Sequence, residues 1–456
     1  MSRLIIPKQA RRRVRVGMFG AIDTKRHKST VSFSTATECR NFDMSSGALR
    51  EGYGTAPHSA VPADAVRYYM YRYYSEALGC FADQYVYQKA NGRLMYYEPT
   101  TGMRLYISGE PFPPMRALNY RLDSKDVLLL SFDGGKLMSW NGSVLTEYES
   151  PTVSSMALHY ERLFVTSDEQ PTKVFFSENL DPTNFDISAD GGGFIELLDE
   201  RGDLNKVVSF GGYLYIFRDH GISRVTAYGD QREFSVVNLF VTAGRIYPSS
   251  IATCGNVIMF LASDGIYAFD GYECKRVLTN LDGTIAPGDG CSCAFFDGKY
   301  YLACKLNNGG ETLGGLIVYD RALGEYSVSA GLDIGFMNAA TYNGEDILMC
   351  CCGGTGGVIV RNGTLGDVPL EKTWTGAYTD LGVPDRIKTV REIYIQTTAP
   401  VTLTLHCANR SKSIAVAPGE RRVRVNFCAS RFALSVSTTS AHCEIAPPTL
   451  VYTIGG

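Results

Sequence analysis

Short apolar runs separated by turn residues recur along most of the chain. In the stretch "LASDGIYAFDGYECK" (261–275), two Asp-Gly pairs enclose only the four residues 266–269. Asp-Gly between apolar runs is a strong signal for a tight turn between paired strands. A strand this short is not stable alone. The pattern therefore predicts many short strands that share one core.

The same order of turn, strand, turn and strand returns at intervals. It occurs in "SFDGGKLMSWNGSVLTEYE" (131–149) and again in "TYNGEDILMCCCGGTGGVIVRNGTL" (341–365). Seven units spaced by 37 to 53 residues start at Leu78, Ala117, Ser154, Val207, Ser249, Cys291 and Met337. A repeat of about 40 residues built from short strands predicts a β-propeller. We expect about seven blades, or six, over residues 60–368.

The pattern changes after the last unit. From Trp374 onward, segments such as "VTLTLHC" and "RRVRVNFC" alternate between apolar and polar residues with turn residues at regular intervals. This alternation predicts a separate C-terminal β-sandwich over residues 369–456. Residues 1–59 show little periodicity and are expected to form an extended N-terminal arm and lead-in, with one strand added to a blade near "TVSFST" (30–35). The predicted fold class is all-β.

Charge is distributed unevenly along the chain. The net charge is −3, yet residues 1–28 hold nine basic residues and one acidic residue, a balance of +8 that leaves −11 for the remainder. The candidate partner-binding residues are Arg3, Lys8, Arg11, Arg12, Arg13, Arg15, Lys25, Arg26 and Lys28. So basic a segment buries too little apolar area to offset an ordering entropy of roughly 1–2 kcal/mol per residue. We expect it to become ordered against an acidic partner, and we favour a protein neighbour over DNA.

The sequence offers little catalytic chemistry. Nucleophile elbows, HExxH motifs, phosphate loops and calcium loops are absent, and "FRDHGISRV" (217–225) lacks the leading Ser and the Trp of a sialidase Asp box. The 13 cysteines form no C-x-x-C pair and the six histidines are scattered, so no metal or cofactor is expected. No apolar run reaches the roughly 18 residues of a membrane helix. We expect a protein that is not an enzyme, with all its thiols reduced.

Four segments resemble the β-propeller tail hub or nozzle proteins of tailed bacteriophages, also called DNA-stabilisation proteins. The first, "ATECRNFDMSSGALREGYGTAP" (36–57), has an Asn followed by a Gly-x-Leu-x-x-Gly turn. The others are "HYERLFVTSDEQPTKVFFSENLDPTNF" (159–185), "VTAGRIYPSSIATCGNVIMFLASDGIYAFDG" (241–271) and "WTGAYTDLGVPDRIKTVREIYI" (374–395). The resemblance covers most of the chain as phrases and layout, without a signature residue set.

The resemblance implies a structural virion protein. Such a subunit forms a ring, hexameric in short-tailed phages, next to portal or adaptor proteins. It is assembled in the host cytoplasm, retains packaged double-stranded DNA and lets it pass during ejection. Two alternatives stay open from the residues alone. One is a propeller binding module, at the tail tip or elsewhere, that recognises a host receptor or a protein partner. The other is a carbohydrate-active enzyme, which would need opposed carboxylates in a pocket.

Overall fold

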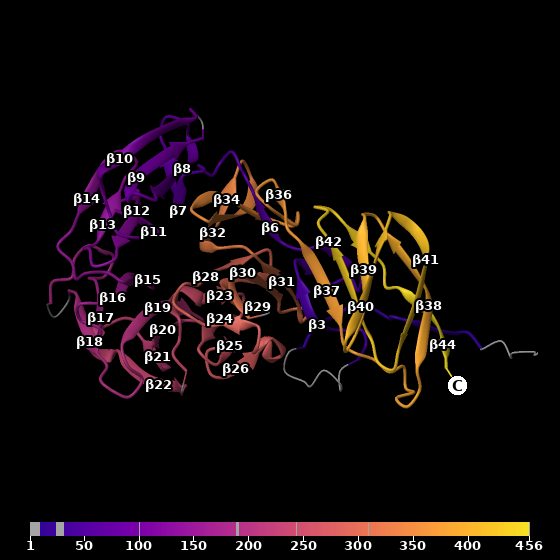
Figure 1. The fold of residues 1–456 in the computed structure, drawn as a ribbon. Coiled ribbons are helices and arrows are strands. Elements are labelled where there is room, and N and C mark those ends of the chain that lie inside the picture. Colours follow the sequence, from indigo (N-terminus) through magenta and orange to yellow (C-terminus); the bar gives the residue numbers. More distant parts are fainter. Residues whose placement is uncertain are drawn as a thin grey trace, which may run out of the picture.

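The chain folds almost entirely into strands. The computed structural model describes residues 10–23, 32–99, 101–187, 191–242, 244–308 and 310–455. In these residues the only helical segments are three 3-10 turns, Gln231–Glu233, Pro248–Ser250 and Thr279–Leu281. No helix in this described part is long and apolar enough to cross a membrane. The predicted all-β class is confirmed, and Figure 1 shows a ring of small sheets beside a layered β-domain.

The ring is a β-propeller of seven blades, each a sheet of at least four strands in the described residues. Blade 1 contains β7 (Ala65–Ser75), β8 (Cys80–Lys89), β9 (Arg93–Glu98) and β10 (Met103–Pro111). Blade 2 contains β11 (Met115–Leu122), β12 (Lys125–Phe132), β13 (Met138–Trp140) and β14 (Leu145–Glu147). Blade 3 contains β15 (Ser155–His159), β16 (Arg162–Thr166), β17 (Lys173–Phe176) and β18 (Gly193–Glu196). Blade 4 contains β19 (Leu204–Phe210), β20 (Tyr213–Arg218), β21 (Gly221–Thr226) and β22 (Ser235–Val241). Blade 5 contains β23 (Ala252–Cys254), β24 (Val257–Ala262), β25 (Gly265–Phe269) and β26 (Cys274–Val277).

Blades 6 and 7 complete the ring with extra strands. Blade 6 contains β27 (Ile285–Ala286), β28 (Ser292–Phe296), β29 (Lys299–Asn308), β30 (Glu311–Asp320) and β31 (Glu325–Ala330). Blade 7 contains β32 (Ile334–Tyr342), β33 (Glu345–Cys352), β34 (Thr355–Val360), β6 (Gly54–Ala56), β35 (Thr364–Leu365) and β36 (Val368–Pro369). Strand β6 comes from the N-terminal part of the chain and pairs antiparallel with β34. The ring is therefore closed by strands that are about 300 residues apart in sequence.

Apolar clusters fill the spaces between adjacent blades. Tyr68 and Tyr85 of blade 1, for example, share a cluster with Phe336 and Met349 of blade 7. The alternation of buried side chains along each strand produces these clusters, because successive residues point to opposite faces of a blade. Cys351 illustrates this alternation: it faces blade 1, whereas its neighbours Cys350 and Cys352 face blade 6. All 13 cysteines are unpaired.

Six of the seven predicted unit starts lie within three residues of the first residue of β11, β15, β19, β23, β28 or β32. The exception is Leu78, because blade 1 already begins at Ala65. Leu78 lies in the tip of the long β7–β8 hairpin, whose turn residues imitate a boundary between units. The two turns predicted around residues 261–275 connect β24 to β25 and β25 to β26.

The second domain is a sandwich of two sheets. One sheet has the order β1-β44-β38-β43-β5-β4, with β41 also pairing with β38, and the other has the order β2-β3-β37-β42-β39-β40. Its N-terminal strands are β1 (Arg12–Arg15), β2 (Gly20–Ile22), β3 (Thr35–Arg40), β4 (Phe42–Asp43) and β5 (Leu49–Glu51). Its C-terminal strands are β37 (Lys372–Gly376), β38 (Lys388–Thr397), β39 (Val401–Cys407), β40 (Arg410–Val416), β41 (Gly419–Ala429), β42 (Ala433–Thr438), β43 (Glu444–Ile445) and β44 (Thr449–Ile454).

Part of the segment expected to form an arm is thus built into the sandwich. Val16, Phe19 and Ile22 are almost completely buried, and the ring of Phe19 meets that of Trp374 edge to face at 4.8 Å. Strand β3, near the strand predicted to join a blade, pairs instead with β37 of the sandwich. The cause is the set of apolar residues that follows Arg15. These residues pack into a core formed with the C-terminal strands of the same chain.

Asn41 joins the sandwich to blade 6. Its backbone N–H donates to the carbonyl of Val328 at 3.1 Å, and its Oδ1 accepts from the N–H of Ala330 at 2.8 Å. Its Nδ2 donates to the carbonyl of Glu371 at 2.7 Å. The carbonyl of Asn41 accepts from the N–H of Gly52, which ends the Gly-x-Leu-x-x-Gly phrase. This phrase is therefore the β4–β5 hairpin that holds Asn41 against the propeller.

Candidate interaction face

Four of the nine predicted partner-binding residues lie in the described part of the chain. Arg12, Arg13 and Arg15 belong to β1, which pairs antiparallel with β44, and Arg11 precedes them. The remaining predicted residues, Arg3, Lys8, Lys25, Arg26 and Lys28, lie outside the described residues. The described arginines thus occupy an edge strand of the sandwich.

The same sheet contains a second basic strand, β41, with the sequence "RRVRV" at 421–425. Two rows cross the sheet through paired residues. One row is Arg15, Thr449, Tyr394 and Arg422, and the other is Arg13, Val451, Glu392 and Arg424. The intervening row is Val14, Leu450, Ile393 and Val423, whose members are in or packed against the sandwich core. Because side chains alternate between the two faces of a sheet, both arginine rows point outward.

We call Arg11, Arg13, Arg15, Arg422 and Arg424 the basic face. The strand pattern R-x-R that produces it is present twice in the sequence, in "RRRVRV" (11–16) and in "RRVRV" (421–425). The sequence alone indicates only the first copy as a candidate binding segment, since nothing in it shows that the two strands share a sheet. Together with Glu392 and Glu420 on the same side, five arginines and two glutamates give a balance of +3.

Glu392 lies at the centre of this face and is only 6% exposed. The Nε and Nη2 of Arg422 donate to its two carboxylate oxygens at 3.0 and 2.6 Å. The Nη1 of Arg11 lies 3.9 Å from its Oε1. The hydrogen bonds from Arg422 hold the pKa of Glu392 below its ordinary value. This carboxylate orients two of the arginines, while Arg13, Arg15 and Arg424 make no ion pair within the described residues.

A shallow groove of 490 Å³ runs beside this carboxylate. It is lined by Arg15, Tyr394, Ile395, Gln396, Glu420, Arg421, Arg422, Ala446, Pro447 and Thr449. The guanidinium of Arg422 lies 5.9 Å from the ring centre of Tyr394, within cation–π range. Planar guanidinium groups with free donors recognise carboxylates and phosphates. The groove and the free arginines therefore suit an acidic partner surface.

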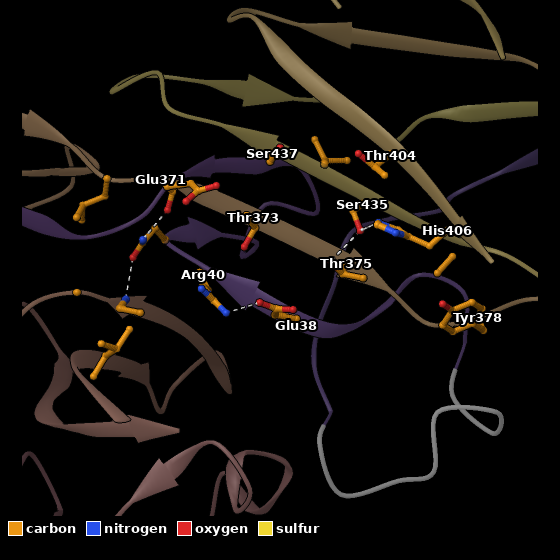
Figure 2. A pocket seen from close by; sticks show the side chains of 17 residues that line it. Glu38, Arg40, Glu371, Thr373, Thr375, Tyr378, Thr404, His406, Ser435 and Ser437 are labelled. Atoms are coloured by element: carbon orange, nitrogen blue, oxygen red, sulfur yellow. Dashed lines mark hydrogen bonds and ion pairs between the residues drawn. The ribbon is translucent and has the colours of Figure 1, made fainter. Parts of the chain in front are cut away.

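A second cavity, of 640 Å³, lies between the sandwich and blade 6 (Figure 2). Hydroxyl groups line its sandwich side in a ladder across β37, β42 and β39. The hydroxyls of Thr375 and Ser435 are 2.9 Å apart, and Ser435 is 2.8 Å from the Nε2 of His406. On β3, next to β37 in the same sheet, Arg40 pairs with Glu38 at 2.7 Å. Such cross-strand hydroxyl pairs commonly stabilise a sheet.

The Ser435–His406 pair brings together the two groups, a hydroxyl and an imidazole, that act as nucleophile and base in some hydrolases. A catalytic pair of this kind needs a third group to orient the imidazole and donors for an oxyanion. In the described residues no carboxylate hydrogen-bonds the other ring nitrogen of His406, and burial lowers the pKa of this histidine. Thr375, the further neighbour of Ser435, is also a hydroxyl. The ladder is therefore better explained as sheet stabilisation.

Potential metal ligands do not gather in the described part of the chain. There, no group of three or more His, Cys, Asp or Glu side chains is arranged to hold an ion. The three consecutive cysteines of β33 alternate between two different inter-blade clusters. The chemistry that the described residues bring together is therefore that of charged and hydroxyl-bearing surfaces.

No family model matches the chain, and no curated protein matches it. Among solved structures, it is similar to virginiamycin B lyase from Staphylococcus aureus, with 10% identity and a TM-score of 0.42 over 64% of this chain and 99% of that one. It is also similar to the extracellular domain of a one-component system from B. thetaiotaomicron, with 10% identity and a TM-score of 0.43 over 93% and 64%. A third is BBS1N in complex with ARL6DN, with 11% identity and a TM-score of 0.43 over 68% and 95%. Because these TM-scores lie below 0.5, the propeller assignment rests on the sheet topology.

Proposed function

We propose that this protein is a ring-forming structural subunit of a bacteriophage tail, which retains packaged DNA and forms part of the conduit for genome ejection. The proposal rests on one observation, the combination of these domains and this sequence phrase in a single chain. One chain combines a seven-bladed propeller, a sandwich built from both ends of the chain and a phrase at 36–57 that resembles the tail hub and nozzle proteins. That phrase forms the hairpin that holds Asn41 at the junction of the two domains.

The form of the basic face supports a docking role in an assembly. Its arginines come from two strands that are fixed in one sheet, and Glu392 orients two of them. Charged side chains spread over one face of a sheet suit an extended acidic surface better than a small substrate, which binds in a concave and mostly apolar site. We assign the face to a protein neighbour, because duplex DNA carries one charge per about 1.7 Å and a strongly basic conduit would retain it during ejection.

The mass of the purified protein in solution tests the proposal. A ring subunit gives one discrete particle at a multiple of the 50.0 kDa chain mass in mass photometry, and a symmetric ring in negative-stain images. A chain that remains at 50.0 kDa at all concentrations, with or without portal and adaptor proteins, overturns the ring assignment. If such a monomer binds a host-surface receptor, the alternative of a tail-tip binding module replaces it.

A further inference from the structure

The negative charge of the body is concentrated in one part of the propeller. Residues 141–203, which include the end of blade 2 and all of blade 3, hold thirteen acidic and three basic residues, a balance of −10. The whole chain after residue 28 carries −11. Blade 3 and its borders therefore account for nearly all of the excess negative charge outside the N-terminal segment.

Three segments that carry many of these acidic residues are joined by hydrogen bonds: the end of blade 2, the β16–β17 connection and the end of β18. The hydroxyls of Thr152 and Ser167 are 2.6 Å apart, which joins the end of blade 2 to the β16–β17 connection. The N–H of Leu197 donates to the carbonyl of Thr172 at 2.9 Å, which joins that connection to the end of β18. We call the four exposed carboxylates on these segments, Glu147, Asp168, Glu169 and Glu196, the acidic edge.

The carboxylates of the acidic edge have no ion pair within the described residues, whereas two nearby carboxylates do. Glu149 pairs with Lys136 at 2.6 Å. Asp199 pairs with Arg218 at 2.8 Å and with Arg201 at 3.3 Å. These exposed carboxylates without an ion pair complement the three arginines of the basic face that also have none within the described residues.

We propose that the basic face of one copy docks on the acidic edge of the next copy of this chain. This inference rests on the proposed ring function and names the two surfaces that would form its interface. Blade 3 (β15–β18) and the sandwich lie at opposite ends of the molecule (Figure 1). A contact between two different surfaces is heterologous, so it adds copies head to tail and closes into a ring when the rotation permits.

Charge complementarity disfavours a twofold contact that is centred on either surface alone. Such a contact would place basic face against basic face, or acidic edge against acidic edge, and like charges across an interface are strongly unfavourable. Opposite charges also steer association, and salt screens them over about 10 Å at 0.1 M ionic strength. The assembly should therefore weaken as salt is raised.

Charge reversal on each surface provides the test. The face variant carries Arg13→Glu, Arg15→Glu and Arg424→Glu, and the edge variant carries Glu147→Lys, Asp168→Lys, Glu169→Lys and Glu196→Lys. A matched control carries Arg386→Glu and Arg431→Glu, two exposed sandwich arginines that are not among the outward residues of the two arginine rows. Far-UV circular dichroism and a urea titration confirm that each variant is folded, and mass photometry then measures the assembly.

For each of the two surface variants alone, we expect the dissociation constant of assembly to be at least about tenfold higher than for the unmodified chain, because like charges now face each other. The control should assemble normally. An equimolar mixture of the face and edge variants should recover assembly, since every contact in an alternating ring is again between opposite charges. If the unmodified chain forms rings and the folded face and edge variants do so equally well, this interface is wrong while the ring function stands. If the unmodified chain does not assemble under any condition, the proposed function itself fails.

Discussion

Replacing Phe19 with alanine tests whether the N-terminal segment is part of the sandwich. Phe19 is 1% exposed and lies 4.8 Å from Trp374, ring centre to ring centre. Truncating a buried phenylalanine costs about 3–5 kcal/mol, and the lost aromatic pair is included in that range. With a urea dependence of about 1–3 kcal/mol per molar, the unfolding midpoint should fall by about 1 M or more.

Tryptophan fluorescence can follow this unfolding in the sandwich alone. The chain has two tryptophans, Trp140 in blade 2 and Trp374 in the sandwich. In a Trp140→Phe background, the emission of Trp374 reports the sandwich during a urea titration. Met18→Ala is the matched control, because Met18 is the next residue and is 59% exposed.

The control should change the free energy of unfolding by no more than about 0.5 kcal/mol. If Phe19→Ala shifts the Trp374 transition no further than Met18→Ala does, then the segment is not part of the sandwich core. In that case the basic face, which depends on β1 being in this sheet, loses its structural basis.

Three further predictions concern other parts of the molecule. Asn41→Ala should lower the free energy of unfolding, measured by urea titration, by about 1–3 kcal/mol for each buried group left unpaired. The control is Asn343→Ala, which also replaces an Asn with positive φ but lies in an exposed turn. It should lower the free energy of unfolding much less. Burial lowers the pKa of His159 from 6.5 to about 4, so as the pH falls the unfolded chain takes up the proton first. The free energy of unfolding should therefore fall as the pH drops from 6.5 to about 4. In a His159→Asn variant, the urea midpoint should depend less steeply on pH across that range. Alkylation of the native protein should modify the exposed Cys80 and Cys428 first, and all 13 thiols should react once the chain is unfolded without reductant, which mass spectrometry counts; native disulfides would contradict this.

The blades could be predicted from the sequence because each is a local unit. Turn residues and alternating strands of blade 5 lie within about 25 residues, so their pairing is visible in one short stretch. Strand β6 could not be assigned, since its partner β34 is about 300 residues away and three residues carry no distinctive pattern. In the N-terminal segment, the many basic residues indicate a solvated arm, and the three-residue spacing of Val16, Phe19 and Ile22 is not the period of two that predicts a strand.

The candidate interaction face shows the same limit. The alternation in "RRVRVNFC" predicts a strand, whereas "RRRVRV" lies in the segment expected to form an arm; both segments contain strands in the structure. Their meeting in one sheet depends on β38 and β44, which lie between them and are specified by separate segments. The role of Glu392 is equally hidden, because a single glutamate in a strand does not reveal that Arg422 will cover it.

The interleaving of the two chain ends has a consequence for synthesis. As a ribosome makes this chain, β6 emerges early but has to wait for residues 358–360 before the last blade can form. Likewise β1 waits for residues 449–452, and β3 waits for β37. A nascent chain that stops midway therefore contains several finished blades but neither a closed propeller nor a sandwich. Synthesis of residues 449–452 then acts as a checkpoint, since only a chain that contains them can pair β1 and present the basic face.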